Sequence, residues 1–100
     1  MAYKIIYKER FVQKLFNLLD YLKKEWGAVT AEKFLKRLQI RLDTLSQQPF
    51  IGTPSIVVKG VRSILITRQN RIYYRVKNDT IEVINMYDTR ANPKKNPYKL

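Results

Sequence analysis

The feature that most constrains the fold is the close spacing of three strand-like segments in the second half of the chain. Residues Val61–Arg68, Arg71–Lys77 and Thr80–Asp88 are rich in Ile, Val and Tyr, which favour strands. Two residues separate each segment from the next, and Asn78 and Asp79 suit a tight hairpin turn. Connections this short predict an antiparallel three-stranded meander.

The first half of the chain predicts one strand and two helices. Residues Ala2–Glu9 alternate in polarity, whereas Arg10–Trp26 carries apolar side chains at the three- and four-residue steps of an amphipathic helix. We expect Gly27 to end this helix in a left-handed cap and Thr30 to begin the next helix as its N-cap. The second helix should end before Pro49, because a proline pushes the preceding residue out of helical geometry. With two or three residues between them, the helices should form an antiparallel hairpin.

Together these elements predict an α+β fold in a single domain. The order is strand, helix, helix, strand, strand, strand, with both helices packed on one face of the sheet. We expect residues 1–100 to form one domain, because a chain of this length is too short for two cores. Residues 89–100 hold two prolines, four basic residues and no periodicity, so we expect a flexible tail there.

The residue types that are missing exclude several classes of chemistry. The chain contains no cysteine and no histidine, which excludes disulfides, thiolate metal sites, Ser–His or Cys–His nucleophile pairs and the commonest general base. We therefore expect neither a metal nor a cofactor. No apolar run approaches the roughly 20 residues that span a bilayer. With no apolar signal region at the amino terminus, we expect a cytoplasmic protein without a membrane partner.

Charge is the strongest global property of the sequence. Twenty Lys and Arg against eight Asp and Glu give a net charge of +12. Such an excess indicates an anionic partner, which can be a phosphate backbone, an anionic surface or an acidic protein, although a solvated surface tuned for solubility is the alternative. Residues 59–100, with ten basic and three acidic groups, are more cationic than residues 1–58, with ten and five.

The segment "NRIYYRVK" at 70–77 predicts where this charge gathers. Alternation places Ile72, Tyr74 and Val76 toward the helices and leaves the residues between them on an open sheet face. Arginine forks match phosphate oxygens and tyrosine rings can stack on bases, a combination that suits single-stranded RNA. The alternative is a solvent-facing row of long cations that cover tyrosine rings. The candidate nucleic-acid-binding residues are Arg68, Tyr73, Arg75, Lys77, Lys94 and Lys95.

Four ordered sequence passages carry a resemblance to a known family. They are Leu45, Pro49 and Gly52 in a loose Leu-x-x-Pro-x-x-Gly pattern, Gly-Val-Arg at 60–62, Arg-Ile-Tyr-Tyr-Arg-Val at 71–76, and Asp-Thr-Arg at 88–90. With the order of elements, they make the chain resemble the RelE/ParE superfamily of bacterial type II toxins. The resemblance implies a toxin that is neutralised by a cognate antitoxin encoded beside it.

The resemblance also implies roles for individual residues. Arg71 matches the arginine that holds the scissile phosphate in RelE-like toxins, while Arg62 and Arg90 match residues that stabilise charge. Tyr87 or Tyr98 matches the late tyrosine, and we take Tyr87 as the candidate acid or base. The chain departs from the family where Ile64 replaces a second lysine and Thr89 and Arg90 stand where a related branch has a His–Tyr pair. No carboxylate stands in the connector to serve as base.

Three functions follow from the resemblance and the charge. RelE-like toxins cut messenger RNA on the ribosome through attack of the ribose 2′-hydroxyl on the neighbouring phosphate, and we favour this activity because Arg62, Arg71 and Arg90 are present. A ParE-like toxin poisons DNA gyrase without nuclease chemistry, and a third alternative is a basic module that only binds RNA. The nuclease hypothesis requires the three guanidinium groups to converge on one exposed concavity.

Overall fold

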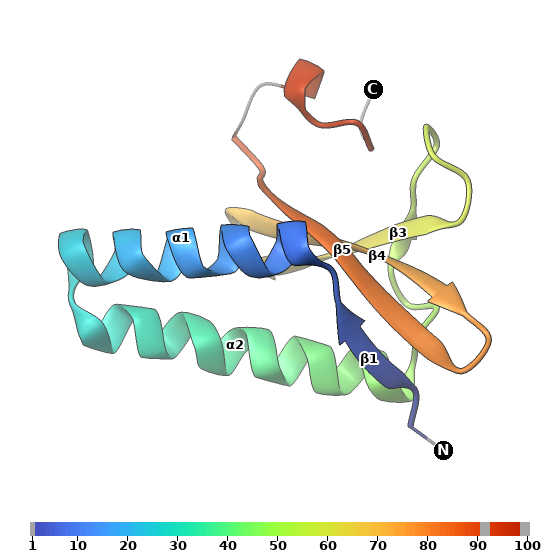
Figure 1. Cartoon of the computed structure of the whole chain (residues 1–100), viewed down its shortest axis with the longest axis horizontal. Helices are drawn as coiled ribbons and strands as arrows, with labels where there is room; N and C mark the ends of the chain where they lie inside the picture. Colours follow the sequence, from blue (N-terminus) through green and yellow to red (C-terminus); the bar gives the residue numbers. More distant parts are fainter. Residues whose placement is uncertain (1, 91–92, 99–100) are drawn as a thin grey trace.

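The computed structural model describes residues 2–90 and 93–98, which form a five-stranded sheet with a helical hairpin on one face (Figure 1). The strand order is β1-β5-β4-β3-β2, with β1 parallel to β5 and the other neighbours antiparallel. This confirms the α+β fold and the meander, and it adds the short strand β2, which the sequence did not predict. The elements are β1 (Lys4–Tyr7), α1 (Glu9–Trp26), α2 (Ala28–Gln47), β2 (Thr53–Pro54), β3 (Val61–Thr67), β4 (Asn70–Lys77), β5 (Thr80–Asp88) and the short 3-10 helix η1 (Pro93–Lys95).

The junction between α1 and α2 is tighter than the sequence predicted. Gly27 alone separates the helices, with a φ of 95° that glycine adopts more readily than other residues. The prediction that Thr30 is the N-cap of α2 was wrong, because the helix begins at Ala28. Instead, the Thr30 hydroxyl donates a hydrogen bond to the Trp26 carbonyl at 3.2 Å and ties the two helices together.

The main core lies between the helices and the sheet. It is built from aromatic and aliphatic side chains. Apolar residues repeat every 3.6 positions along the helices and every second position along the strands, and the two apolar surfaces that result pack against each other. Its buried members are Phe11, Phe34, Leu38, Leu42, Leu45, Ile64, Ile66, Ile72, Tyr74, Ile81, Val83 and Met86. In the described part of the chain neither helix is long and apolar enough to cross a membrane.

The connector after α2 is anchored to this core by Tyr74. The buried Tyr74 hydroxyl donates to the Pro49 carbonyl at 2.8 Å and accepts from the Gly52 amide at 2.9 Å. Gly52 lies so close to the tyrosine ring that a Cβ there would collide with the hydroxyl. Through Pro49 and Gly52, two residues of the pattern noted in the sequence, these contacts fix the turn that leads from α2 to β2.

The second face of the sheet is covered. The prediction of an open sheet face was therefore wrong. Val61, Tyr73 and Ile84 are buried there under partly buried Val58, Tyr87 and Tyr98. Figure 1 shows the helical hairpin and the tail that carries η1 on opposite sides of β5. A β-bulge in the β4–β5 pairing contributes to this second cluster, since Ile84 is the extra residue between the pairs Tyr74–Val83 and Tyr73–Asn85. The predicted flexibility of residues 89–100 stays a prediction, and residues 91–92 and 99–100 of that tail lie outside the described residues.

Candidate anion-binding site

The structure separates the three arginines on which the nuclease hypothesis rested. In the β3–β4 pairing Arg62 stands opposite Tyr74, which belongs to the helix-side core. Arg71 stands opposite Leu65 and Tyr87 and lies on the second face. Because residues paired across a sheet share a face, Arg62 and Arg71 extend from opposite faces. The expectation that they converge with Arg90 on one concavity was therefore wrong.

Arg62 and Arg90 are each engaged by groups of the chain itself. Arg62 Nη1 donates to the carbonyls of Phe50 at 3.2 Å and Gly52 at 2.9 Å, so this guanidinium holds the connector. Arg90 forms a two-pronged ion pair with Asp88, with Nε 3.0 Å from Oδ1 and Nη2 2.8 Å from Oδ2. Hydrogen bonds from Arg90 hold the pKa of the Asp88 carboxyl below its ordinary value.

Two of the predicted nucleic-acid contacts, Tyr73 and Arg75, are placed differently from the expectation. Tyr73 is buried and stacks on Tyr98 with 4.7 Å between ring centroids, so its ring is not free to stack on a base. Arg75 faces away from the helices, but its Nε lies 3.3 Å from a Glu82 carboxylate oxygen, and Lys8 approaches the other oxygen at 3.4 Å. The remaining predicted residues, Lys77, Lys94 and Lys95, are exposed at the end of β4 and on η1.

A pocket on the second face brings together Arg68, Arg71 and Tyr73 of the predicted residues. It has a volume of about 510 Å³ and lies between the connector, the end of the β3–β4 hairpin and the tail. Among the residues that the structure describes, no acid lines it. Its lining residues are Thr53, Pro54, Ser55, Ile56, Ser63, Leu65, Arg68, Arg71, Tyr73, Thr89 and Tyr98.

Polar residues that the sequence analysis did not single out build this pocket. The Ser63 hydroxyl accepts a 2.9 Å hydrogen bond from Arg71 Nη1 and so orients the guanidinium. The Asn96 side chain donates through Nδ2 to the Tyr73 hydroxyl at 3.0 Å and accepts at Oδ1 from the Tyr98 backbone amide at 3.0 Å. Ser55 donates to the Tyr98 carbonyl at 2.9 Å. These contacts hold residues 96–98 over the sheet. No local sequence pattern predicts the bonds from Asn96 to Tyr73 and from Ser55 to Tyr98, because the bonded residues lie far apart in the chain.

The two candidate tyrosines have different surroundings. Tyr98 lines the pocket, whereas Tyr87 lies beside it under Lys14, whose Nζ is 3.5 Å above the ring centroid and donates to the Met86 carbonyl at 3.1 Å. Burial raises the pKa of Tyr87. Burial also lowers the pKa of Lys14, with the nearby Arg10 as the second cause. A phenol with a raised pKa is a poorer base at neutral pH, so Tyr87 is a weak candidate for proton transfer.

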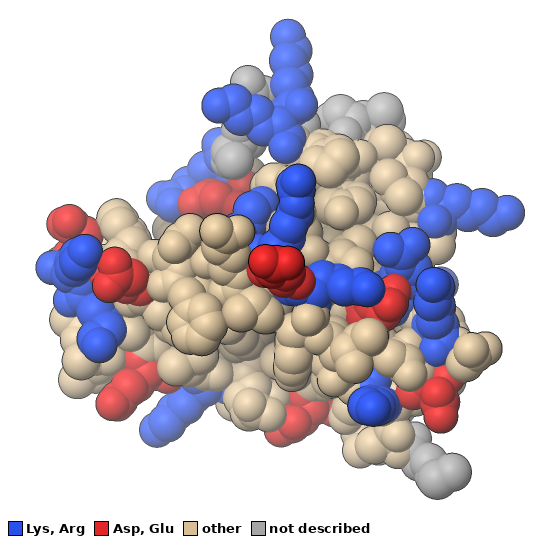
Figure 2. All heavy atoms as spheres, in the orientation of Figure 1, with Lys and Arg blue, Asp and Glu red and all other residues tan. Residues whose placement is uncertain are grey.

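The arrangement is suited to binding an anion. The Arg68 and Arg71 side chains, with no acid among the described residues that line the pocket, provide donors for a phosphate or carboxylate, and the hydroxyls around them add further hydrogen-bond partners. Among the described lining residues only serine, threonine and tyrosine hydroxyls are available to move a proton. On the face shown in Figure 2, acids lie among bases along the helical hairpin at the left, and basic groups project at the top, where the tail lies.

Comparison with known proteins identifies the family to which this small, basic α+β chain belongs. The model of the ParE toxin of type II toxin–antitoxin systems (parDE) matches residues 5–93. The chain therefore belongs to the ParE toxin family, within the RelE/ParE superfamily, and is a toxin of a type II system with a cognate antitoxin as its partner. Among curated proteins, none is similar enough in sequence to match.

Several solved structures share the fold. A chain of the chromosomal ParDE system of P. aeruginosa superposes with a TM-score of 0.73 at 18% identity, covering 87% of this chain and 96% of that one. A mutant of E. coli RelE in the free state gives 0.63 at 19% identity, covering 98% and 95%. A YoeB/ParE toxin from Agrobacterium tumefaciens gives 0.59 at 17% identity, covering 85% and 96%. At these identities the likeness shows the fold.

Proposed function

We propose that this toxin acts by binding DNA gyrase, and not by cutting RNA. The observation that carries the proposal is the separation of the arginines: Arg62 and Arg71 lie on opposite faces, and Arg90 is paired with Asp88. Cleavage through a ribose 2′-hydroxyl needs a proton acceptor and several cations around a single phosphate. The match to the ParE family model supports the same choice, because ParE-like toxins are the branch that poisons gyrase.

The pocket with Arg68 and Arg71 is the part of the surface that we assign to this binding. Gyrase works on DNA, whose phosphates are the anions that an arginine pair recognises. Ser63 already holds the Arg71 guanidinium in place, which lowers the entropy lost when a phosphate binds. Such a toxin acts in the cytoplasm, where gyrase and its DNA are found.

A supercoiling assay with purified components tests the proposal. We expect the toxin to inhibit supercoiling of relaxed plasmid by gyrase and to increase the amount of cleaved plasmid trapped on the enzyme. The double variant Arg68→Ala/Arg71→Ala should require about tenfold more protein for the same effect. Lys24→Ala, which removes an exposed cation from the helical hairpin, should behave as the unmodified toxin does. Unchanged supercoiling at a large excess of toxin would overturn the proposal.

RNA cleavage is the second candidate, and the pocket itself favours it. Arg68, Arg71 and the Tyr98 phenol line one pocket, which is the residue set that a weak phosphodiester cleavage site would need. In that case, induction of the toxin in cells should produce transcript cuts in register with codons, and Arg71→Ala should abolish them. Primer extension on cellular transcripts, read in parallel with a reporter of DNA damage, separates the two candidates.

A further inference from the structure

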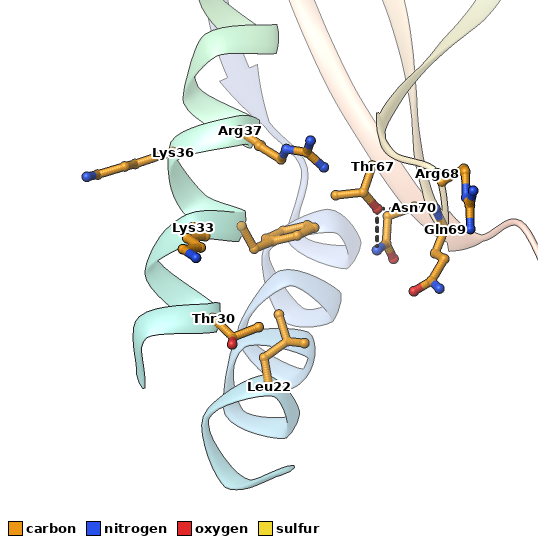
Figure 3. A pocket seen from close by; sticks show the side chains of 10 residues that line it. Leu22, Thr30, Lys33, Lys36, Arg37, Thr67, Arg68, Gln69 and Asn70 are labelled. Atoms are coloured by element: carbon orange, nitrogen blue, oxygen red, sulfur yellow. Dashed lines mark hydrogen bonds between the residues drawn. The ribbon is translucent and has the colours of Figure 1, made fainter. Parts of the chain in front are cut away.

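A hollow of about 580 Å³ lies between the helical hairpin and the turn that joins β3 to β4 (Figure 3). Its volume falls within the range of about 300–1,000 Å³ that is typical of small-ligand pockets. Among the described residues, Arg68 alone lines both this hollow and the anion-binding pocket, so the two are separate sites. The lining residues of the hollow are Leu22, Thr30, Lys33, Phe34, Lys36, Arg37, Thr67, Arg68, Gln69 and Asn70.

The helical hairpin supplies an apolar floor and positive charge side by side. Thr30, Phe34 and Arg37 follow one another at steps of four and three residues, which places them on one face of α2, and Lys33 lies next to them. Phe34 is 5% exposed, and together with the half-buried Leu22 of α1 it forms the apolar part of the lining. A ligand seated here therefore meets apolar surface and cations at the same time.

The cations of the hollow are not neutralised by acids of the chain. Lys33, Lys36, Arg37 and Arg68 line it, and in the part of the chain that the structure describes no Asp or Glu does. Within the same residues none of these four side chains forms an ion pair. Guanidinium and ammonium groups left in this state are well suited to phosphate oxygens.

The opposite wall presents a carboxamide on a turn that is held on both sides. The Gln69 amide donates to Thr67 Oγ1 at 3.2 Å, and the Gln69 carbonyl accepts from the Thr89 amide at 2.8 Å. Asn70 Nδ2 also donates to Thr67 Oγ1, at 3.1 Å. The Gln69 carboxamide itself has no hydrogen-bond partner among the described residues. Figure 3 shows Arg37 and Gln69 reaching toward the hollow from opposite walls.

A gap filled with water and rimmed by solvated cations is the simpler explanation and has to be weighed. It accounts for the charges, because long cationic side chains face water on any basic protein. It does not account for the apolar floor, which water covers at a cost in free energy. An anionic lipid chain would use the floor and the cations but would leave the Gln69 carboxamide unused. A nucleotide uses all three, since its base has apolar faces and a polar edge and its phosphates are anionic.

We propose that this hollow binds a free nucleoside triphosphate. The base lies on Leu22 and Phe34 with its edge toward Gln69, and the phosphates lie among Lys33 and Arg37. A carboxamide matches the neighbouring donor and acceptor of adenine, so adenosine triphosphate is the probe that we choose. The inference goes beyond the proposed function and does not depend on whether gyrase or RNA is the target.

A titration of the full-length, isotope-labelled toxin with adenosine triphosphate tests the site. At about 0.15 M salt, which screens long-range attraction between exposed charges, we expect a dissociation constant of about 10–100 µM by calorimetry. In NMR spectra the shifts should be confined to residues 30–37 and 67–70. Inorganic tripolyphosphate, which carries the charge but no base, should bind at least about fivefold more weakly.

Variants at exposed positions test both ends of the ligand. Arg37→Ala removes a phosphate contact and Gln69→Glu places a negative charge opposite the base, and each should weaken binding at least about fivefold. The matched controls are Lys24→Ala and Gln13→Glu, which make the same changes of charge at exposed positions outside the hollow. Both should stay within about twofold of the unmodified toxin. Arg37 does not line the anion-binding pocket, so Arg37→Ala should still inhibit gyrase in the supercoiling assay.

Several outcomes would overturn the proposal. One is the absence of saturable binding up to about 1 mM adenosine triphosphate. Equal affinity for tripolyphosphate, or shifts scattered over the basic surface, would reduce the interaction to non-specific attraction by the net charge. A single-stranded oligoadenylate that binds at least about tenfold more tightly, with shifts that continue to Arg71 and Tyr98, would instead assign the hollow to a nucleotide of a strand.

Discussion

The two faces of the sheet are covered in different ways. The face under α1 and α2 buries a continuous set of aliphatic and aromatic side chains, with Leu45, Ile72 and Tyr74 fully inaccessible. On the second face the apolar cluster of the described residues buries Val61, Tyr73 and Ile84, and its cover is a loop and a tail held by a few side-chain hydrogen bonds and by the Tyr98 ring. The helix face supplies the stability of the fold, and the second face carries the anion-binding pocket, where weaker packing leaves room for a ligand.

The largest effect should come from opening a cavity on the helix face. Phe11→Ala removes a ring that is 1% exposed and should lower the free energy of unfolding by about 3–5 kcal/mol. Denaturant unfolding followed by circular dichroism measures the change. Ile56→Ala, at a side chain that is 81% exposed beside the second face, should stay within about 0.5 kcal/mol of the unmodified protein. Similar losses from both substitutions would contradict the contrast between the faces.

The neighbouring tyrosines of β4 allow the same substitution on each face. Tyr74→Phe leaves the Gly52 amide and the Pro49 carbonyl without their buried partner, and should cost about 1–3 kcal/mol. Tyr73→Phe removes one hydrogen bond from Asn96 and should cost about 0.5–1.5 kcal/mol. The measurement is the urea concentration at the unfolding midpoint of each variant. The variants are compared with the same slope of unfolding free energy against urea concentration. A larger loss at Tyr73 would mean that the tail stabilises the fold more than the connector does.

The tail should respond to loss of its stacked ring without loss of the fold. Tyr98→Ala removes the ring contact with Tyr73 and should lower stability by about 0.5–1.5 kcal/mol. Limited proteolysis should cut this variant faster near its C-terminus, while its circular dichroism spectrum stays that of the unmodified toxin. Equal cleavage rates for the two proteins would show that Tyr98 does not hold the tail in place.

The smallest effect should come from acidification at the Asp88–Arg90 pair. The folded-state pKa of Asp88 lies below its ordinary value of 3.8, so the pair adds stability above that pH and the contribution is lost as pH falls through the folded value. The Arg90 side chain is largely exposed and that of Asp88 is partly exposed, so solvent screens the pair and keeps the effect small. The stability difference between the unmodified toxin and Asp88→Asn should therefore shrink on acidification. A difference that grows at low pH would contradict this assignment.

The secondary structure and the fold class could be predicted from the sequence because they depend on local periodicity. The three closely spaced strands permit little besides a meander, and the stripe that starts at Arg10 defines the first helix with an error of one residue. The excess of positive charge in the second half of the chain could also be predicted, because it follows from counting charged residues in the sequence. By contrast, β3 is apolar on both faces, so alternation left open which way Arg62 points.

The functional surface depended on contacts between residues that are distant in the chain. Tyr73 is buried because Asn96 and Tyr98 return over the sheet, and Arg71 is oriented because β3 places Ser63 beside it. Strand pairing likewise places Arg62 and Arg71 on opposite faces of the sheet. It also leaves Ile64–Thr67 without a strand partner on the side away from β4 among the described residues. Periodicity acts over a few residues, whereas these arrangements arise from long-range packing and hydrogen bonding, which only the folded chain brings about.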